Sequence, residues 1–182
     1  ALQTVDPARD HARLDFDSAT AEKLPQATGW SAVQTVLDRA AILLAFEQVG
    51  GADASLRMAV DYANERYAFG RPIGSFQAIK HKLADMYVAL ELARSNAFYG
   101  AWALTENDAE LPLAAATARV SATDAFHLAS KENIQTHGGI GFTWAVDCHL
   151  FYRRSKNLGL ALGGAPFWKN RLVELLETRN AA

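Results

Sequence analysis

The sequence lacks several features that mark particular classes of protein. Cys148 is the one cysteine in 182 residues, so the chain cannot form an internal disulfide. No apolar run reaches the roughly 18 residues that a membrane-spanning helix needs. The formal net charge is −2, with no basic or acidic block, which gives no electrostatic reason to bind nucleic acid or an anionic membrane. We therefore expect a cytoplasmic protein with no nucleic-acid partner.

Motifs for metal binding and nucleophilic catalysis are also missing. A di-iron bundle needs Glu-x-x-His on each of two helices, and the nearest match, Asp124 to His127, occurs once. There is no Cys-x-x-Cys pair and no Gly-x-Ser-x-Gly elbow. The glycines of GGIGFT (138–143) lack the preceding strand that a dinucleotide-binding glycine motif requires. We expect neither a metal site nor a Rossmann-type nicotinamide site.

Long helical periodicity begins after Gly29. The pattern predicts a first helix from Ser31, a candidate N-cap, to about Tyr67. Gly50 and Gly51 lie inside this helix, where each costs about 1 kcal/mol relative to alanine. Their presence indicates either close packing or a bend.

A second helix is predicted to begin at Ser75. Its apolar residues recur in alternating steps of three and four, a seam typical of antiparallel bundle packing. The seam consists of Phe76, Ile79, Leu83, Met86, Leu90, Ala93 and Ala97. A third helix is expected over about 113–136. Residues 134–164 are expected to form the next connection and then a fourth helix. A fifth helix is expected over 166–180, with Pro166 in its first turn.

These helices predict an all-α fold. Residues 29–182 are expected to form an up-and-down four-helix bundle with an extra C-terminal helix. Residues 1–28 differ, because Leu14 and Phe16 share one face of a possible strand. A two-stranded hairpin alone is marginally stable. We therefore interpret this segment as a short β remnant, the tail of a middle β domain whose remainder is missing from this chain.

Two loops at predicted helix ends combine glycines with groups that bind phosphate. ERYAFGRPIGSFQ (65–77) places Arg66 at the end of one helix, and IQTHGGIG (134–141) places Gln135 one turn before two glycines. Glycine lets a ligand approach the backbone closely, and arginine makes paired hydrogen bonds to phosphate. The residues alone leave two interpretations open: ligand-binding loops, or helix-capping groups without a ligand.

The sequences YANERYAFGRPIGSFQAIKHKLADM (62–86) and IQTHGGIGFTWAVDCHLFYRRSK (134–156) closely resemble the carboxy-terminal helical domain of acyl-CoA dehydrogenases. The resemblance runs from about residue 29 to 165 and implies that FAD is bound between subunits. The family's Arg-x-x-Phe-Gly and Gln-x-x-Gly-Gly elements touch the flavin nucleotide of a neighbouring subunit. By position, the implied FAD contacts are Arg66, Phe69, Gly70, Gln77, Gln135, Gly138 and Gly139.

The resemblance also implies a reaction, the α,β-dehydrogenation of an acyl-CoA thioester with a glutamate as the base. In most family members the glutamate stands at the position that Leu162 occupies here, and in some at the position of Ala40. Neither residue can accept a proton. This pattern resembles the base-lacking subunit type of bacterial heteromeric members.

The implied partners are an acyl-CoA substrate, another acyl-CoA dehydrogenase-like subunit in a homo- or hetero-oligomer, and electron-transfer flavoprotein as the acceptor. Our preferred hypothesis is a subunit that contributes FAD binding and an oligomer interface without its own base. One alternative is an active dehydrogenase whose base has moved to Glu47 or His137. The other is a non-catalytic helical interaction module.

Overall fold

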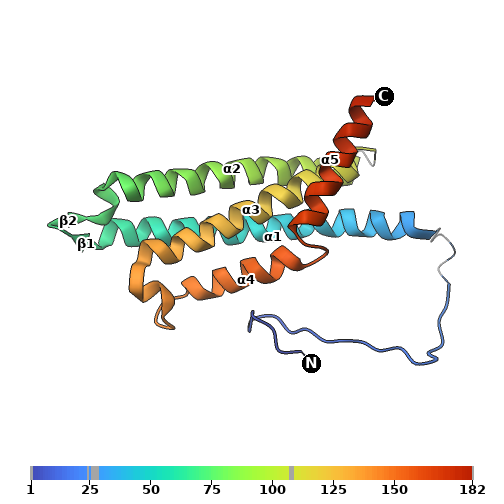
Figure 1. Cartoon of the computed structure of the whole chain (residues 1–182), viewed down its shortest axis with the longest axis horizontal. Coiled ribbons are helices and arrows are strands. Elements are labelled where there is room, and N and C mark those ends of the chain that lie inside the picture. The colour runs from blue at the N-terminus through green and yellow to red at the C-terminus, as the bar shows by residue number, and fades with distance from the viewer. Residues whose placement is uncertain (1, 24, 26–28, 107–108, 182) are drawn as a thin grey trace.

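The computed structural model describes residues 2–23, 25, 29–106 and 109–181 (Figure 1). The helices in these residues are α1 (Gly29–Glu65), α2 (Gln77–Glu106), α3 (Leu111–His137), α4 (Cys148–Leu160) and α5 (Ala165–Ala181). α1 is joined to α2 by two short antiparallel strands, β1 (Tyr67–Ala68) and β2 (Arg71–Pro72), followed by the 3-10 turn η1 (Ile73–Ser75). A second 3-10 turn, η2 (Gly138–Phe142), follows α3. None of the described helices combines the length and the apolar character needed to cross a bilayer.

Helices α1 to α4 alternate in direction along one bundle. Consequently α1 and α3 run parallel and end on the same side of the molecule (Figure 1). α3 packs most extensively against α1 and also contacts α2, α4 and α5. α5 leaves the bundle at an angle from the end where α4 stops (Figure 1). This arrangement confirms the predicted bundle with an extra C-terminal helix.

The core joins the apolar seam of α2 to small residues of α1 and α3. The last four residues of the predicted seam, from Met86 to Ala97, are buried, whereas its first three are half-buried.

The two neighbouring glycines of α1 have different surroundings. A Cβ added to Gly51 would lie 2.4 Å from the ring of Phe126, which is 1% exposed, whereas one added to Gly50 would meet no atom within 4 Å. Gly51 therefore marks close packing between α1 and α3, which is one of the two predicted explanations.

Two predicted helix starts are wrong by two residues. α1 begins at Gly29, so Ser31 lies in its first turn rather than at the N-cap. α2 begins at Gln77, because Ser75 belongs to η1, where its hydroxyl donates a hydrogen bond to the Pro72 carbonyl at 2.7 Å. A hydroxyl engaged in the preceding turn is not available to cap the next helix.

The strand predicted around Leu14 and Phe16 is wrong for this chain. Described residues 2–23 contain no strand, only an isolated bridge between Leu2 and His11, because an extended segment without a neighbouring strand has no ladder to join. Leu14 and Phe16 are 75% and 81% exposed. The assignment of residues 1–28 to a middle β domain stays a prediction, and residues 1, 24 and 26–28 lie outside the described part.

The beginning of the chain is nevertheless attached to the bundle by charged side chains. Arg154 of α4 binds the buried carboxylate of Asp6, and its Nη1 lies 2.7 Å from Glu47 Oε1 on α1. Arg9 approaches the other Glu47 oxygen at 3.5 Å. One guanidinium thus connects three separate parts of the chain.

Helix α5 is held against the bundle by Trp168 and Arg171. Trp168 is buried, and its indole N–H donates to the Leu162 carbonyl at 3.1 Å. Arg171 Nη2 lies 2.7 and 3.0 Å from the two carboxylate oxygens of Asp38 on α1. Burial raises the pKa of Asp38 to about 6, although the Arg171 guanidinium acts in the opposite direction. The contact between α1 and α5 therefore contains a carboxyl that titrates near neutral pH.

Candidate functional site

The loop after α1 is a tight hairpin with an exposed tip. Its turn has two residues with positive φ, Phe69 at +52° and Gly70 at +79°. The Arg66 carbonyl accepts a hydrogen bond from the Ile73 N–H at 2.8 Å, which closes the base of the loop. Phe69 is 96% exposed, and Arg71 stacks 4.0 Å above the ring of Phe76. The hairpin therefore presents an aromatic ring and basic groups to the outside.

The loop after α3 begins at a glycine that reverses the chain. Gly138 has φ +64°, and its N–H donates to the carbonyls of Gln135 and Ile134. Gln135 lies on the exposed side of the last helical turn. A Cβ on Gly141 would lie 2.6 Å from the Ile134 carbonyl oxygen, so η2 is folded tightly back onto the end of α3.

The structure brings the two loops to one end of the bundle. Because α1 and α3 are parallel, the hairpin and η2 both emerge where these helices end (Figure 1). Tyr62 of α1 stacks on His137 of α3 with ring centroids 4.1 Å apart. Four predicted cofactor residues, Arg66, Phe69, Gly70 and Gln77, thus lie in and directly after the hairpin, and Gln135, Gly138 and Gly139 lie at the end of α3.

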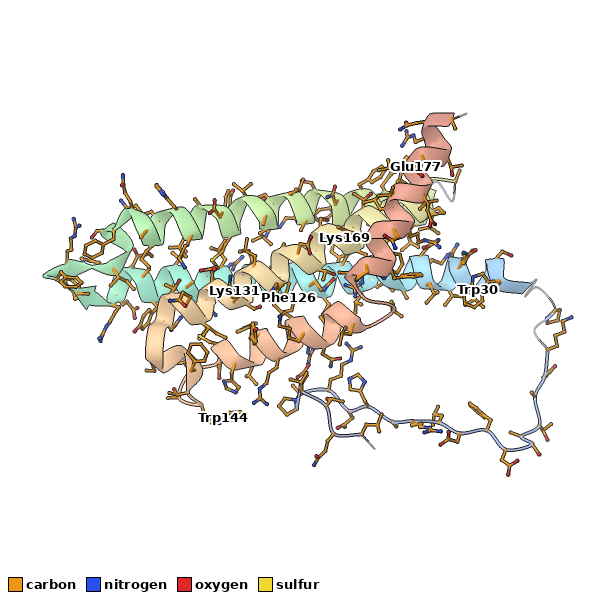
Figure 2. The ribbon with its side chains drawn as sticks, in the orientation of Figure 1. Trp30, Phe126, Lys131, Trp144, Lys169 and Glu177 are labelled. Atoms are coloured by element: carbon orange, nitrogen blue, oxygen red, sulfur yellow. The ribbon has the colours of Figure 1, made fainter. Side chains whose placement is uncertain are left out.

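A cavity of about 340 Å³ extends from Gln135 between α3, η2 and α4. The described lining residues are Lys131, Ile134, Gln135, Gly141, Phe142, His149, Tyr152 and Arg153, with no carboxylate among them. Trp144 projects beside it from the loop that joins α3 to α4, 72% exposed, with Arg153 4.8 Å from its ring (Figure 2). Sequence reasoning missed this basic and aromatic cavity. The clue available was a lysine one helical turn before Gln135.

The groups at this end of the bundle fit a flavin dinucleotide. A Cβ at Gly70, Gly138 or Gly139 would meet no atom within 4 Å, so the backbone of both turns is open to a ligand. Arg66 and Gln135 are exposed and carry the donors that a pyrophosphate needs. The observed surface is therefore compatible with FAD.

The turn after α4 holds Leu162 in a left-handed conformation, with φ +59°. Arg119 of α3, which is buried, donates to the Ala161 carbonyl at 2.8 Å and also binds the Leu158 carbonyl. Together with the Trp168 bond to the Leu162 carbonyl, these contacts fix the turn on both sides of Leu162. The side chain is half-buried and packs against the cluster that contains Ala41, next to Ala40. Both positions where the resemblance implies a base are thus apolar.

The two substitute bases considered from the sequence are already engaged in other contacts. Glu47 is paired with Arg154 at 2.7 Å and lies 3.5 Å from Arg9. His137 is buried, and its Nδ1 lies 2.9 Å from the Asn133 carbonyl oxygen, which assigns the Nδ1–H as a donor. Glu47 is therefore held in ion pairs, and Nδ1 of His137 is occupied by the backbone.

Comparison with known proteins identifies relatives of the chain. A model of the acyl-CoA dehydrogenase C-terminal domain matches residues 27–165. Acyl-CoA dehydrogenase IpdE2 of Mycobacterium tuberculosis is 45% identical over 154 residues, which cover 85% of this chain and 44% of that protein. A variant of the Tcur3481-Tcur3483 steroid ACAD superimposes with a TM-score of 0.79 and 32% identity, over 84% of this chain and 42% of that one. A chain of the ChsE4-ChsE5 complex from Mycobacterium tuberculosis superimposes with a TM-score of 0.72 and 30% identity, over 80% of this chain and 38% of that one.

The bundle and these matches define a helical domain of the dehydrogenase type. More particularly, the chain belongs to the acyl-CoA dehydrogenase family, of which it contains the C-terminal domain. The chain spans about two fifths of the length of the relatives and structures compared above.

Proposed function

We propose that this chain supplies the FAD-binding and subunit-contact part of an acyl-CoA dehydrogenase and does not supply the catalytic glutamate. One contrast supports the proposal above all. The residues of both flavin-loop motifs are retained and lie exposed at one end of the bundle, whereas Ala40 and Leu162 are apolar at both positions where the family has its glutamate.

In the proposed reaction, a base removes the α proton of an acyl-CoA thioester while a hydride leaves the β carbon. FAD, when bound, supplies the acceptor for that hydride. The base must lie within hydrogen-bonding reach and must be desolvated enough to be basic. Leu162 can exclude water and shape the acyl site, but it cannot hold a proton. The proton acceptor is therefore assigned to a second subunit.

The geometry favours this assignment over a base relocated within the chain. Glu47 is paired with two arginines, with Arg154 at 2.7 Å and with Arg9 at 3.5 Å. His137 uses Nδ1 to bind backbone and its ring to stack on Tyr62. Both side chains have structural partners that explain their presence.

The proposed assembly is a heteromer with a second acyl-CoA dehydrogenase-like chain, and electron-transfer flavoprotein is the proposed electron acceptor. Two of the similar structures carry paired chain names, Tcur3481-Tcur3483 and ChsE4-ChsE5, which supports a two-chain assembly. The first is described as a steroid ACAD, which supports a bulky acyl group in the thioester.

The test is to co-express the full-length protein with the dehydrogenase-like chain encoded beside it. Visible absorption, subunit masses and acyl-CoA-dependent reduction of an acceptor dye are then measured. We expect a flavin band, two chain types, and turnover that is lost when the glutamate of the second chain is replaced by glutamine. Normal turnover by this full-length chain alone would refute the base-lacking assignment. A colourless complex would instead indicate a helical interaction module.

A further inference from the structure

One aromatic contact connects the ends of the two helices that carry the flavin loops. The rings of Tyr62 and His137 are stacked, with centroids 4.1 Å apart and an interplanar angle of 23°. Tyr62 lies one helical turn before Arg66, and its carbonyl accepts the Arg66 N–H at 2.9 Å. A displacement of Tyr62 would therefore move the backbone from which the hairpin starts.

His137 is held equally firmly on the side of α3. It directly precedes Gly138, it is 6% exposed, and its Nδ1 lies 2.9 Å from the carbonyl oxygen of Asn133. A Cβ on Gly141 would lie 3.0 Å from the Cβ of His137, so η2 packs on this residue. The imidazole thus contacts the neighbouring helix while its own backbone supports the glycine turn.

The same register is set one turn earlier along the two helices. The side-chain Nδ2 of Asn133 lies 3.4 Å from the sulfur of Met58. Each of these two residues precedes the stacked residue of its own helix by four positions. A soft N–H to sulfur contact is weaker than a stacked ring pair with a directed hydrogen bond. Tyr62 lies three residues before the end of α1, and His137 is the last residue of α3.

We propose that His137 is a positioning residue that sets the spacing between the hairpin after α1 and the glycine turn after α3. The inference rests on the proposed function, since it assumes that a single FAD molecule contacts both loops. A dinucleotide held at two points binds well only when the distance between those points is fixed beforehand. The role assigned to His137 is neither proton transfer nor direct contact with the flavin.

The experiment uses the full-length complex and measures the affinity for FAD after the cofactor has been removed, by titration of the visible flavin band. His137→Ala removes both the stack and the hydrogen bond, and we expect FAD to bind about 10-fold more weakly. His137→Phe keeps a ring that can stack on Tyr62 and should recover most of the affinity. Tyr62→Ala removes the same stack from the α1 side and should resemble His137→Ala. His127→Ala, an exposed histidine on the same helix, is the matched control.

The outcomes separate this inference from the function on which it rests. Loss of affinity in His137→Ala and Tyr62→Ala with recovery in His137→Phe supports the positioning role, since a general loss of folding would not be rescued by a ring. Equal FAD affinity in all variants overturns the inference alone. Equal loss in the phenylalanine and alanine variants overturns the stack as the positioning element. A wild-type complex that binds no FAD overturns the proposed function as well.

Discussion

The paired glycines of α1 give the sharpest test of how the bundle is packed, because they are neighbours with opposite environments. Gly51→Ala would place a Cβ 2.4, 2.6 and 2.9 Å from three ring atoms of Phe126. An ordinary carbon–carbon contact is about 3.5–4.0 Å, so the ring would have to move by about 1 Å. Phe126 is 1% exposed, so a movement of its ring would disturb the buried residues packed around it. Gly50→Ala meets no atom within 4 Å.

The expected free energies follow from two opposing effects. Replacing glycine by alanine within a helix favours the folded state by about 1 kcal/mol, and this gain applies to both variants. Overpacking a core costs about 1–3 kcal/mol, and the short distances at Gly51 place it in the upper part of that range. We therefore expect Gly51→Ala to be destabilised by about 1–2 kcal/mol and Gly50→Ala to be stabilised by about 0.5–1 kcal/mol.

Urea unfolding followed by circular dichroism measures both changes, provided that the slope of the transition stays constant. A third variant, Gly51→Ala with Phe126→Leu, should recover part of the loss because the two sites are in contact and their effects are not additive. Stabilisation of Gly51→Ala, or the same change in both single variants, would refute the described packing of α1 against α3.

Three further predictions concern charged groups. Arg119→Met should lower the free energy of unfolding by about 1–3 kcal/mol in the same assay, because buried acceptors lose their donor, and Arg119→Lys should recover part of it. The pKa of Asp38 is raised to about 6 in the folded protein, above the ordinary value of 3.8 that applies to the unfolded chain. Protonation therefore favours the folded state, and the free energy of unfolding should fall by about 2–3 kcal/mol between pH 4 and pH 7. Asp38→Asn should remove that fall in urea titrations at the two pH values, and an unchanged slope would contradict the assignment. Glu47→Gln should leave acyl-CoA turnover of the complex unchanged, and abolished turnover would show that Glu47 is the base.

The fold could be predicted from the sequence where local patterns decide it. The seam of α2 was predicted correctly, because steps of three and four place Met86 and Leu90 on one side of a helix whatever its neighbours are. The strand around Leu14 was not, because a strand exists only beside another strand, and alternation says nothing about whether that neighbour is present. The start of α2 was missed because Ser75 has two possible hydrogen-bonding roles, and the 3-10 turn takes it.

For the candidate site, the sequence indicated the two loops but not how they are related. The Tyr62–His137 stack and the Met58–Asn133 contact each join residues that are 75 positions apart in the chain. Both depend on the register of α1 against α3, and no local sequence pattern fixes that register. The cavity beside Gln135 arises in the same way, since α4 must fold back before Arg153 can face α3. The seven cofactor contacts implied by the resemblance remain predictions that FAD titration can test.

The parallel course of α1 and α3 has a consequence for the charge at the proposed cofactor site. Each helix ends there with a partial negative charge equivalent to about half an electron, since its last carbonyls point outward. A pyrophosphate between the two ends would meet repulsion from both helix dipoles, and Arg66, Arg71, Lys131 and Arg153 must outweigh it. Attraction by exposed side chains is screened over about 10 Å at 0.1 M salt. If FAD binds there, its affinity should therefore fall as the salt concentration rises, which titration of the flavin band at two ionic strengths would measure.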